Sequence, residues 1–359
     1  MRRAESVAST DAAKDKEAYG GFGLPFAVLI VSLWASINLA LNFFNSAALK
    51  GLEKGGWGFS FPWFYSGCHM IASFIGVNVI FQIKPDLNTL SREQWKAKWL
   101  PLLSLSVLMV LNIGCNNESL VYIGLSVNQI IKSITPLPTM VLSFFIEKKR
   151  YTWLLIAAVV VQVLGAIAAV PWHDNDQAAT FGIILCLVSM LAAATKPVLA
   201  GSLMKDMRES GLSPLVLVWY DSLFSIFWIF IISVAKSEPI GVINFMRDQP
   251  ALGWGVILIG SSLAFSYNIV VFYLTKVTSS LTNVILANIK QVLLIVVAAI
   301  FIDHISRWYN IVGMVVFFLA SFAYSYITFS DRGRKKDEPA AKTAEVAPAT
   351  ERTPLSKKG

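Results

Sequence analysis

Residues 279–304 read SSLTNVILANIKQVLLIVVAAIFIDH, and this segment carries one full charge, Lys290, near its middle. A helix that crosses the ~30 Å hydrocarbon core of a bilayer needs about 20 mostly apolar residues, so the segment is long enough to span a membrane. A lysine at the centre of such a helix costs roughly 2.5–3.5 kcal/mol on insertion scales. We therefore expect Lys290 to have a partner, a water-filled cavity or a ligand.

A second apolar segment carries a lysine in the same way. Residues 125–149 read LSVNQIIKSITPLPTMVLSFFIEKK, with Lys132 inside the apolar run. Pro136 and Pro138 follow it, and we expect them to kink this helix, because proline lacks the backbone donor and its ring clashes with the preceding turn.

The composition indicates an integral membrane protein. Of 359 residues, 55% are hydrophobic and 14% are charged, whereas soluble domains carry about 25% charged residues. The net charge of +8 lies mainly in tails and short loops. We interpret it as a determinant of membrane topology, so the expected partner is a lipid bilayer and not nucleic acid.

Ten apolar segments are long enough to cross a bilayer. Backbone in lipid must satisfy its own hydrogen bonds, and the runs lack the alternation of a transmembrane barrel, so we expect helices. Their expected ranges are 24–48, 61–83, 98–117, 120–146, 151–171, 180–203, 213–235, 251–274, 279–302 and 306–328.

Polar tails flank this membrane part. We expect residues 1–22 to form a disordered tail, 23–330 a transporter membrane domain, and 331–359 a disordered basic tail. Ten spans place both termini on one side, which then holds 22 Lys and Arg residues against five on the other side. The positive-inside rule predicts that both tails are cytosolic.

The membrane part contains a weak internal repeat. A shift of about 156 residues places the region 24–171 on the region 180–328, and Glu147 on Asp303. Each copy has five expected helices, an odd number, so consecutive copies have opposite orientations in the membrane. We therefore expect an all-α integral membrane fold of ten transmembrane helices in a 5+5 inverted repeat, with a site at the midplane between the halves.

Four ionisable side chains fall well inside the expected spans. Lys132 and Lys290 occupy the fourth helix of each half, so we expect both to face one central cavity, with Lys196 as a third cation. The plainer alternative is that a long lysine stem reaches the interface, and it applies best to Lys196. Asp221 is interpreted either as a charge partner of one lysine or as a residue that gates the substrate.

Lysines in excess of carboxylates leave such a cavity positively charged and in need of an anion. Phosphate groups supply the charge and several acceptor oxygens, although the argument also admits carboxylates. Asn42 and Asn45 share one face of the first span with Asn38, and either line the pathway or join helices. The sequence shows no metal-ligand spacing, P-loop or Ser-His-Asp set, so we expect no metal, no cofactor and no ATP-driven pump.

Short polar motifs occur along the whole membrane part. They are Trp34 to Asn38 with Asn42 and Asn45, Asn117-Glu118-Ser119, Leu125 to Lys132, Tyr267-Asn268, Val277 to Thr282 and Asn288-Ile289-Lys290. In this order they resemble the motifs of the triose-phosphate/nucleotide-sugar translocator family of the drug/metabolite transporter superfamily. The resemblance implies a ten-helix inverted repeat that works as a strict exchanger.

The resemblance also implies site residues. In the plastid branch of the family, phosphate is held at the positions of Lys132, Tyr267 and Lys290, and by arginines at the positions of Lys196 and Gln291. That branch has His and Thr where this chain has Ile113 and Asn116. The expected substrate-binding residues are Lys132, Lys290, Lys196, Tyr267, Asn116, Gln291, Asn42 and Asn45, with Asp221 as a charge partner.

The departures at Gln291, Ile113 and Asn116 argue against exchange of inorganic phosphate and triose phosphate. A larger ligand held partly by amides fits better, so we expect a secondary antiporter of a nucleotide-sugar against a nucleoside monophosphate. The resemblance then implies a Golgi or endoplasmic reticulum membrane, with a plastid membrane less favoured.

Alternatives remain at this point. The first is a translocator that exchanges sugar phosphate, triose phosphate or phosphoenolpyruvate against phosphate. A membrane-embedded enzyme, a channel and a non-transporting scaffold are less favoured, and a homodimer is left open.

Overall fold

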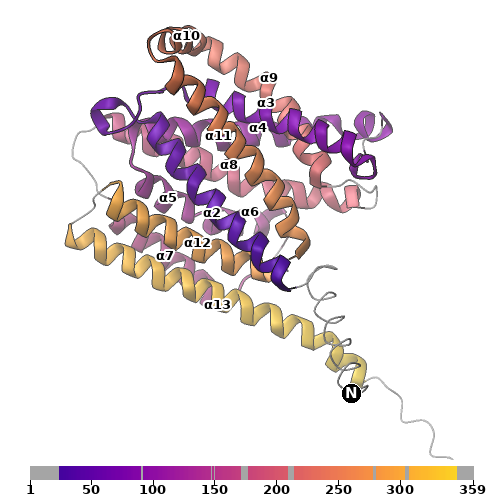
Figure 1. Ribbon diagram of the computed structural model, residues 1–359. Helices are drawn as coiled ribbons and strands as arrows, with labels where there is room; N and C mark the ends of the chain where they lie inside the picture. The colour runs from indigo at the N-terminus through magenta and orange to yellow at the C-terminus, as the bar shows by residue number, and fades with distance from the viewer. Residues whose placement is uncertain are drawn as a thin grey trace, which may run out of the picture.

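The computed structural model describes residues 24–89, 92–146, 148, 150–170, 177–208, 214–277, 280–303 and 307–345. Every regular element in these ranges is a helix, which confirms the all-α class (Figure 1). The main helices are α2 (Leu24–Leu49), α3 (Pro62–Ile83), α4 (Arg92–Tyr122), α5 (Leu125–Ser133), α6 (Pro136–Ile146), α7 (Trp153–Ala169), α8 (Gln177–Arg208), α9 (Pro214–Ala235), α10 (Glu238–Asp248), α11 (Pro250–Val277), α12 (Ser280–Phe301) and α13 (Trp308–Glu345). Two short 3-10 helices are η1 (Leu52–Lys54) and η2 (Pro85–Leu87). The tail expected at 1–22 and Glu147 of the repeat lie outside the described residues.

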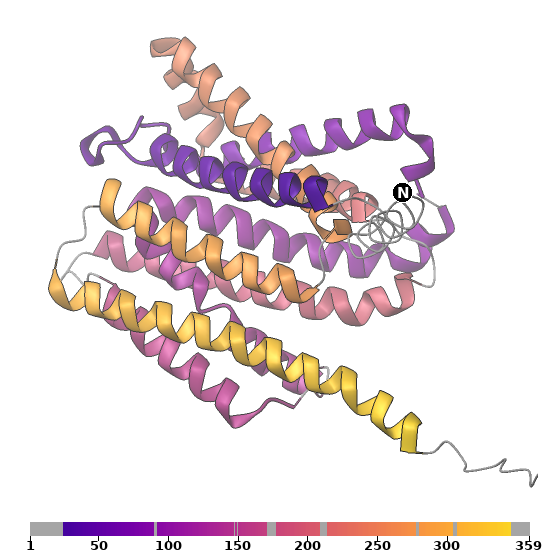
Figure 2. The same cartoon turned by 60° about the horizontal axis from the view of Figure 1, so that its bottom comes forward.

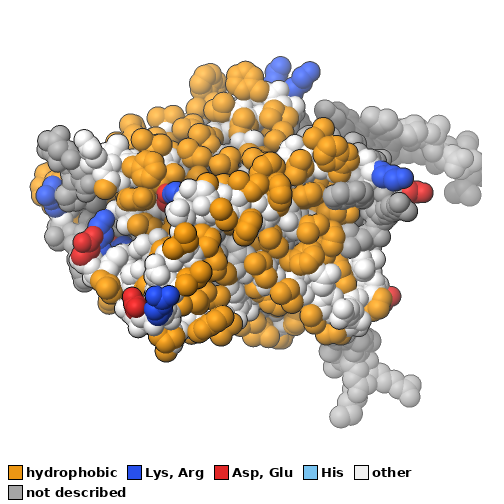
Figure 3. Space-filling view, turned by 90° about the horizontal axis from the view of Figure 1, so that it is seen from above, with side chains coloured by type: hydrophobic (Ala, Val, Ile, Leu, Met, Phe, Trp, Pro, Cys, Tyr) orange, Lys and Arg blue, Asp and Glu red, His pale blue; other side chains and the backbone are white. Residues whose placement is uncertain are grey.

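Eight helices in the described ranges are long and apolar enough to cross a membrane. Two shorter apolar helices, Trp153–Ala169 and Ile289–Phe301, lie where the fifth and ninth spans are expected. Large apolar side chains such as Phe230 and Tyr326 are exposed, and Figure 3 shows hydrophobic side chains across one face with charged ones mainly toward its margins. Such a surface suits lipid and not water. The chain is a multi-pass membrane protein, whereas the count of ten spans stays a prediction.

Several helices differ from the expected spans. The fourth span is divided into α5 and α6, because the backbone makes tighter three-residue turns at Ile134 and Thr135 ahead of Pro136. The short α10 lies in a stretch expected to be a loop, and α4 is longer than expected at both ends. α13 continues to Glu345, so residues 331–345 of the expected disordered tail are helical. That stretch is rich in Arg, Lys, Ala and Glu, which all have high helix propensity.

The helices pack in pairs that relate the two halves of the chain. Contacts join α7 with α13, α4 with α8, α3 with α9, α2 with α11 and α5 with α12. If each helix is replaced by the helix at the corresponding position in the other half of the chain, the same five pairs result. Figure 2 shows α13 (yellow) running along α7.

Glycines allow the close approach of α7 and α13. A Cβ atom at Gly165 would lie 2.6 Å from the backbone nitrogen of Phe317, and one at Gly313 would lie 2.4 Å from that of Ala169. Small residues at helix contacts are typical of membrane proteins, where packing takes over much of the role that the hydrophobic effect has in water.

Candidate functional site

A cavity of about 390 Å³ lies inside the helix bundle, between α2, α3, α4, α5, α11 and α12. Its size falls within the ~300–1,000 Å³ range of small-molecule sites. Seven of the eight expected binding residues line it, namely Asn42, Asn45, Asn116, Lys132, Tyr267, Lys290 and Gln291. We call it the central cavity.

The two central lysines both reach this cavity without a carboxylate partner in the described part of the chain. The Lys132 ammonium on α5 donates a 2.9 Å hydrogen bond to Asn116 Oδ1. The Lys290 ammonium on α12 lies 4.8 Å from the centroid of the Trp34 ring, a cation–π distance. No Asp or Glu is among the described residues that line the cavity. The lining therefore carries two formal positive charges that no described residue of the lining balances.

Side-chain amides connect the helices around these charges. Gln129 Nε2 donates to Asn42 Oδ1 at 3.0 Å and to Asn128 Oδ1 at 3.0 Å. Asn128 Nδ2 donates in turn to Asn116 Oδ1 at 3.1 Å. Gln291 Nε2 donates to the backbone oxygen and to Oε1 of Gln129, at 2.9 and 3.0 Å. Gln291, which stands where the plastid branch has an arginine, thus joins α12 to α5 through its amide nitrogen.

Tyr267 and Asn45 line the cavity from α11 and α2. The Tyr267 side chain makes hydrogen bonds with the side chains of Trp34 and Asn38. Asn45 Oδ1 accepts a 2.8 Å hydrogen bond from the Tyr65 hydroxyl. Both residues are therefore held in place before any ligand arrives.

Lys196 does not line the cavity, so its expected place there is corrected. Its ammonium lies 2.5 Å from Asp221 Oδ2 and 3.2 Å from the sulfur of Met109, a residue that does line the cavity. Lys196 therefore lies behind the lining of the cavity, where the Asp221 carboxylate balances its charge. The structure pairs Asp221 with Lys196, and Asp221 is not among the described residues that line the cavity.

Sequence reasoning missed several lining residues. Asn112 lies one helical turn before Asn116, and Gln129 lies nearly one turn before Lys132, so helical spacing from the expected residues would have found both. Thr135 lies nearly one turn after Lys132 and has the same signal, and Asn117 and Asn268 directly follow Asn116 and Tyr267. His69 lies on α3, where no binding residue was expected. The missed polar residues of the lining are His69, Asn112, Asn117, Gln129, Thr135 and Asn268, whereas Asn38 was expected on the helix face of Asn42 and Asn45.

At one end of the bundle, Asp303 follows α12 and contacts residues at the ends of two other helices. Its Oδ1 lies 3.0 Å from Lys50 Nζ, just after α2, and its Oδ2 accepts a 2.6 Å hydrogen bond from the Ser126 backbone nitrogen at the start of α5. Gly124 leaves room for the carboxylate, since a Cβ atom there would lie 2.6 Å from Asp303 Cγ. We call Lys50, Ser126 and Asp303 the Asp303 latch.

Apolar side chains fill the space between the cavity and the latch. Along α2 the order is Asn45 in the lining, Leu49 in a buried apolar cluster and Lys50 in the latch. Along α12 the same order is Gln291, Leu294 and then Asp303. An apolar layer and an ion pair therefore lie between the central cavity and this end of the bundle.

Comparison with known proteins identifies the family. The UAA transporter family matches residues 88–328. The UDP-uronic acid transporter 1 of Arabidopsis thaliana is 28% identical over 303 residues, which is 83% of this chain and 94% of the relative. The UDP-galactose transporter 1 of the same plant is 26% identical, over 84% of this chain and 87% of the relative.

A further Arabidopsis thaliana relative is described as a probable sugar phosphate/phosphate translocator and is 27% identical, over 83% of this chain and 82% of the relative. These descriptions confirm the resemblance drawn from the motifs, and they indicate a membrane transporter and not an enzyme. The chain belongs to the UAA transporter family.

Proposed function

We propose that the protein is a secondary antiporter that exchanges a nucleotide-sugar against a nucleoside monophosphate across a Golgi or endoplasmic reticulum membrane. The observation that carries this proposal is a cavity with two unbalanced lysines and no described carboxylate, surrounded by amides. A diphosphate or phosphate group supplies the missing negative charge and several acceptor oxygens. Amides both donate and accept, which suits the hydroxyls and base edges of a nucleotide-sugar.

The exchange step follows from the same charges. An empty cavity with two dehydrated ammonium groups is costly to close, because buried charge without a partner loses its hydration. A bound phosphate group removes that cost and lets the halves change between the two open states. The pairwise packing that is preserved when the halves are interchanged supports the 5+5 inverted repeat needed for such a movement. With ten spans, both termini are cytosolic.

The geometry supports the following binding roles. Lys132 and Lys290 bind the phosphate groups, and Tyr267, Asn116, Asn42 and Asn45 contact uncharged parts of the ligand. Gln291 contributes through its remaining carbonyl oxygen and by holding α12 against α5.

Sugar-phosphate transport is the second candidate, and the relatives described as probable sugar phosphate/phosphate translocators favour it. Against it stand Ile113 and Gln291 in the lining, an apolar and a neutral side chain where two cations would strengthen binding of a small phosphate. Self-association as a homodimer stays a prediction.

Counterflow in proteoliposomes tests the proposal. We expect uptake of a labelled nucleotide-sugar only when the vesicles contain a nucleoside monophosphate or a nucleotide-sugar. Lys290→Ala should lower this uptake more than tenfold, since charge-assisted hydrogen bonds are the strong ones in a dry site. The exposed Lys54→Ala is the matched control and should transport normally. Uptake that is equal with and without internal substrate would contradict exchange, and normal transport by Lys290→Ala would show that Lys290 is structural.

A further inference from the structure

A second, smaller cavity adjoins the central cavity behind Lys132. It measures about 160 Å³ and lies between the α5–α6 break, α7, α12 and α13. Lys132, Thr135 and Gln291 line both cavities, so these residues form the wall between them. The other lining residues are Ser133, Pro136, Gln162, Val292, Phe317 and Ser321. We call it the side cavity.

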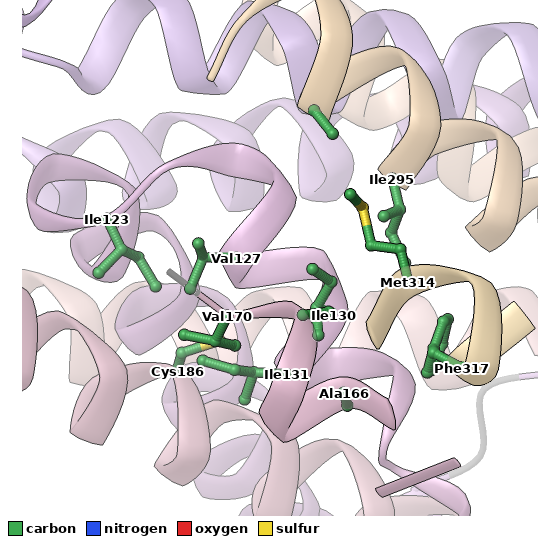
Figure 4. Close-up of a cluster of buried hydrophobic side chains, with 12 residues drawn as sticks. Ile123, Val127, Ile130, Ile131, Ala166, Val170, Cys186, Ile295, Met314 and Phe317 are labelled. Atoms are coloured by element: carbon green, nitrogen blue, oxygen red, sulfur yellow. The ribbon is translucent and has the colours of Figure 1, made fainter. Parts of the chain in front are cut away.

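Polar side chains line the side cavity although its surroundings are apolar. Six of its nine lining residues have polar side chains. Phe317, at its edge, belongs to the cluster of buried hydrophobic side chains shown in Figure 4, together with Ile130 and Ala166. Polar groups inside a membrane protein are expensive and concentrate where a substrate or ion binds or passes.

Gln162 gives the side cavity an acceptor that lacks a donor. The residue is 2% exposed, and its Nε2 donates a 3.1 Å hydrogen bond to the Ser133 backbone oxygen. Its Oε1 has no hydrogen-bond partner among the described residues. A buried carbonyl left in this way destabilises the protein until a donor reaches it.

The hydroxyl groups of the lining point to the same kind of ligand. Ser133 Oγ donates to the Ile130 oxygen at 2.5 Å, Ser321 Oγ donates to the Phe317 oxygen at 2.8 Å, and Thr135 Oγ1 donates to the Lys132 oxygen. Each hydroxyl has thereby used its proton and offers lone pairs to the cavity. Apart from the Lys132 ammonium, the side cavity therefore presents mainly acceptors, which suit the hydroxyl donors of a sugar and not the oxygens of a phosphate.

The size of the side cavity suits one part of a ligand. At ~30 Å³ for each water molecule, 160 Å³ holds about five waters. This is well below the ~300 Å³ at which pockets begin to take whole small ligands, but it has room for a single sugar ring. The movable part of the wall is the Lys132 side chain, whose flexible four-carbon stem lets the ammonium leave Asn116 for a phosphate.

We propose that the side cavity binds the sugar ring attached to the diphosphate of the nucleotide-sugar, and that Gln162 accepts a hydrogen bond from one of its hydroxyls. The diphosphate lies against Lys132 and Lys290 in the central cavity. This assignment rests on the proposed function. It makes Gln162 a determinant of specificity, because a nucleoside monophosphate has no such ring and leaves the side cavity to water.

The test compares two exchange reactions in the same proteoliposomes. Gln162→Leu removes the acceptor at similar volume, and Ser321→Leu fills the side cavity. For Gln162→Leu we expect the KM for nucleotide-sugar to rise about tenfold while exchange of a nucleoside monophosphate against itself is unchanged. For Ser321→Leu we expect nucleotide-sugar exchange to be lost, while exchange of the nucleoside monophosphate against itself is unchanged. Leu164→Ala, at a 60% exposed position on α7, is the control for both.

The outcomes separate the two proposals. Retained monophosphate exchange shows that a variant is folded and inserted. If both variants exchange nucleotide-sugar as the wild type does, the side cavity holds water only, and the sugar assignment is overturned. Equal losses of both reactions in both variants would show a structural role and also overturn it. A wild-type protein that exchanges neither ligand would instead remove the proposed function itself.

Discussion

Breaking the Asp303 latch should favour the state that is open at its end of the bundle. Asp303→Asn removes the charge that pairs with Lys50 but keeps an oxygen that can accept from the Ser126 nitrogen. The lost ion pair has a 3.0 Å Nζ–Oδ1 distance, and its side chains are 13% and 9% exposed. An exposed pair is worth ~0–1 kcal/mol and a charge-assisted hydrogen bond ~1.5–3 kcal/mol, so this partly buried pair is worth about 1–2 kcal/mol. We therefore expect the population open at this end to rise about 5–30-fold.

Thiol labelling measures that population. Cys68, Cys115 and Cys186 are first replaced, and Leu41→Cys places one thiol on the wall of the central cavity. A membrane-impermeant reagent is then applied, in vesicles of known orientation, to the side on which Lys50 lies. We expect the labelling rate to rise about 5–30-fold with Asp303→Asn.

The controls decide whether the ion pair is responsible for that rise. Glu53→Gln, which removes an exposed carboxylate close to Lys50, should leave the labelling rate unchanged. Lys50→Met should raise it, and the double variant with Asp303→Asn should rise no further than either single variant, because both break one interaction. Unchanged labelling in Asp303→Asn, or additive effects of the two substitutions, would refute the latch.

Two stability predictions follow from contacts away from the cavity. Asp221→Leu should destabilise the purified protein by about 1–3 kcal/mol, because it leaves the Lys196 ammonium, whose side chain is 17% exposed, without its charged partner. The double variant with Lys196→Met should recover most of the loss, and a thermal melt in detergent measures both. A double variant no more stable than Asp221→Leu would contradict the pairing. Gly313→Ala should cost about 1–3 kcal/mol because its Cβ atom would lie 2.4 Å from the Ala169 nitrogen. Gly255→Ala, where a Cβ atom meets nothing within 4 Å, is its control, and an equal melting temperature in the two variants would show that α7 and α13 adjust freely.

The sequence predicted those parts of the site that depend on position along a single helix. Lys132 and Lys290 are expected in one cavity because each lies in the fourth helix of its half, at a depth from which its charge does not easily reach water. Asn42 and Asn45 followed from the spacing of one helix face. The interruption between α5 and α6 followed from Pro136 and Pro138, since proline cannot continue the hydrogen bonding of the helix.

Features that depend on contacts between distant segments could not be predicted in this way. Whether Lys196 faces the cavity depends on the neighbour it meets, and Asp221 lies on another helix at a distance in space that no spacing rule gives. Asp303 was noticed only as a match within the repeat, because its role depends on the chain reversal at Gly124 and on Lys50 far away in the sequence. Gln162 is a single amide in an apolar segment, and only the packing of α7 against the α5–α6 break places it at a cavity.

The distribution of carboxylates in the described part of the chain supports the binding role proposed for the central cavity. Four carboxylates of the described helices and loops are buried or nearly so. Three of them bind lysines: Glu118 binds Lys236, Asp221 binds Lys196 and Asp303 binds Lys50. The fourth, Glu238, accepts from the Phe64 backbone nitrogen at the start of α3.

Each of these carboxylates accepts from a nearby lysine or backbone nitrogen. At these places the fold thus supplies a partner that stabilises it. Lys132 and Lys290 lie in the same low-dielectric interior and receive only an amide oxygen and an aromatic ring from the described residues. A carboxylate beside either lysine would stabilise the empty cavity, but it would compete with an anionic ligand for the same ammonium and would let the protein change state unloaded. A cavity whose described lining holds no carboxylate thus meets the requirement of the proposed exchange, because the energetic penalty of the empty state is the property that would couple outward and inward transport.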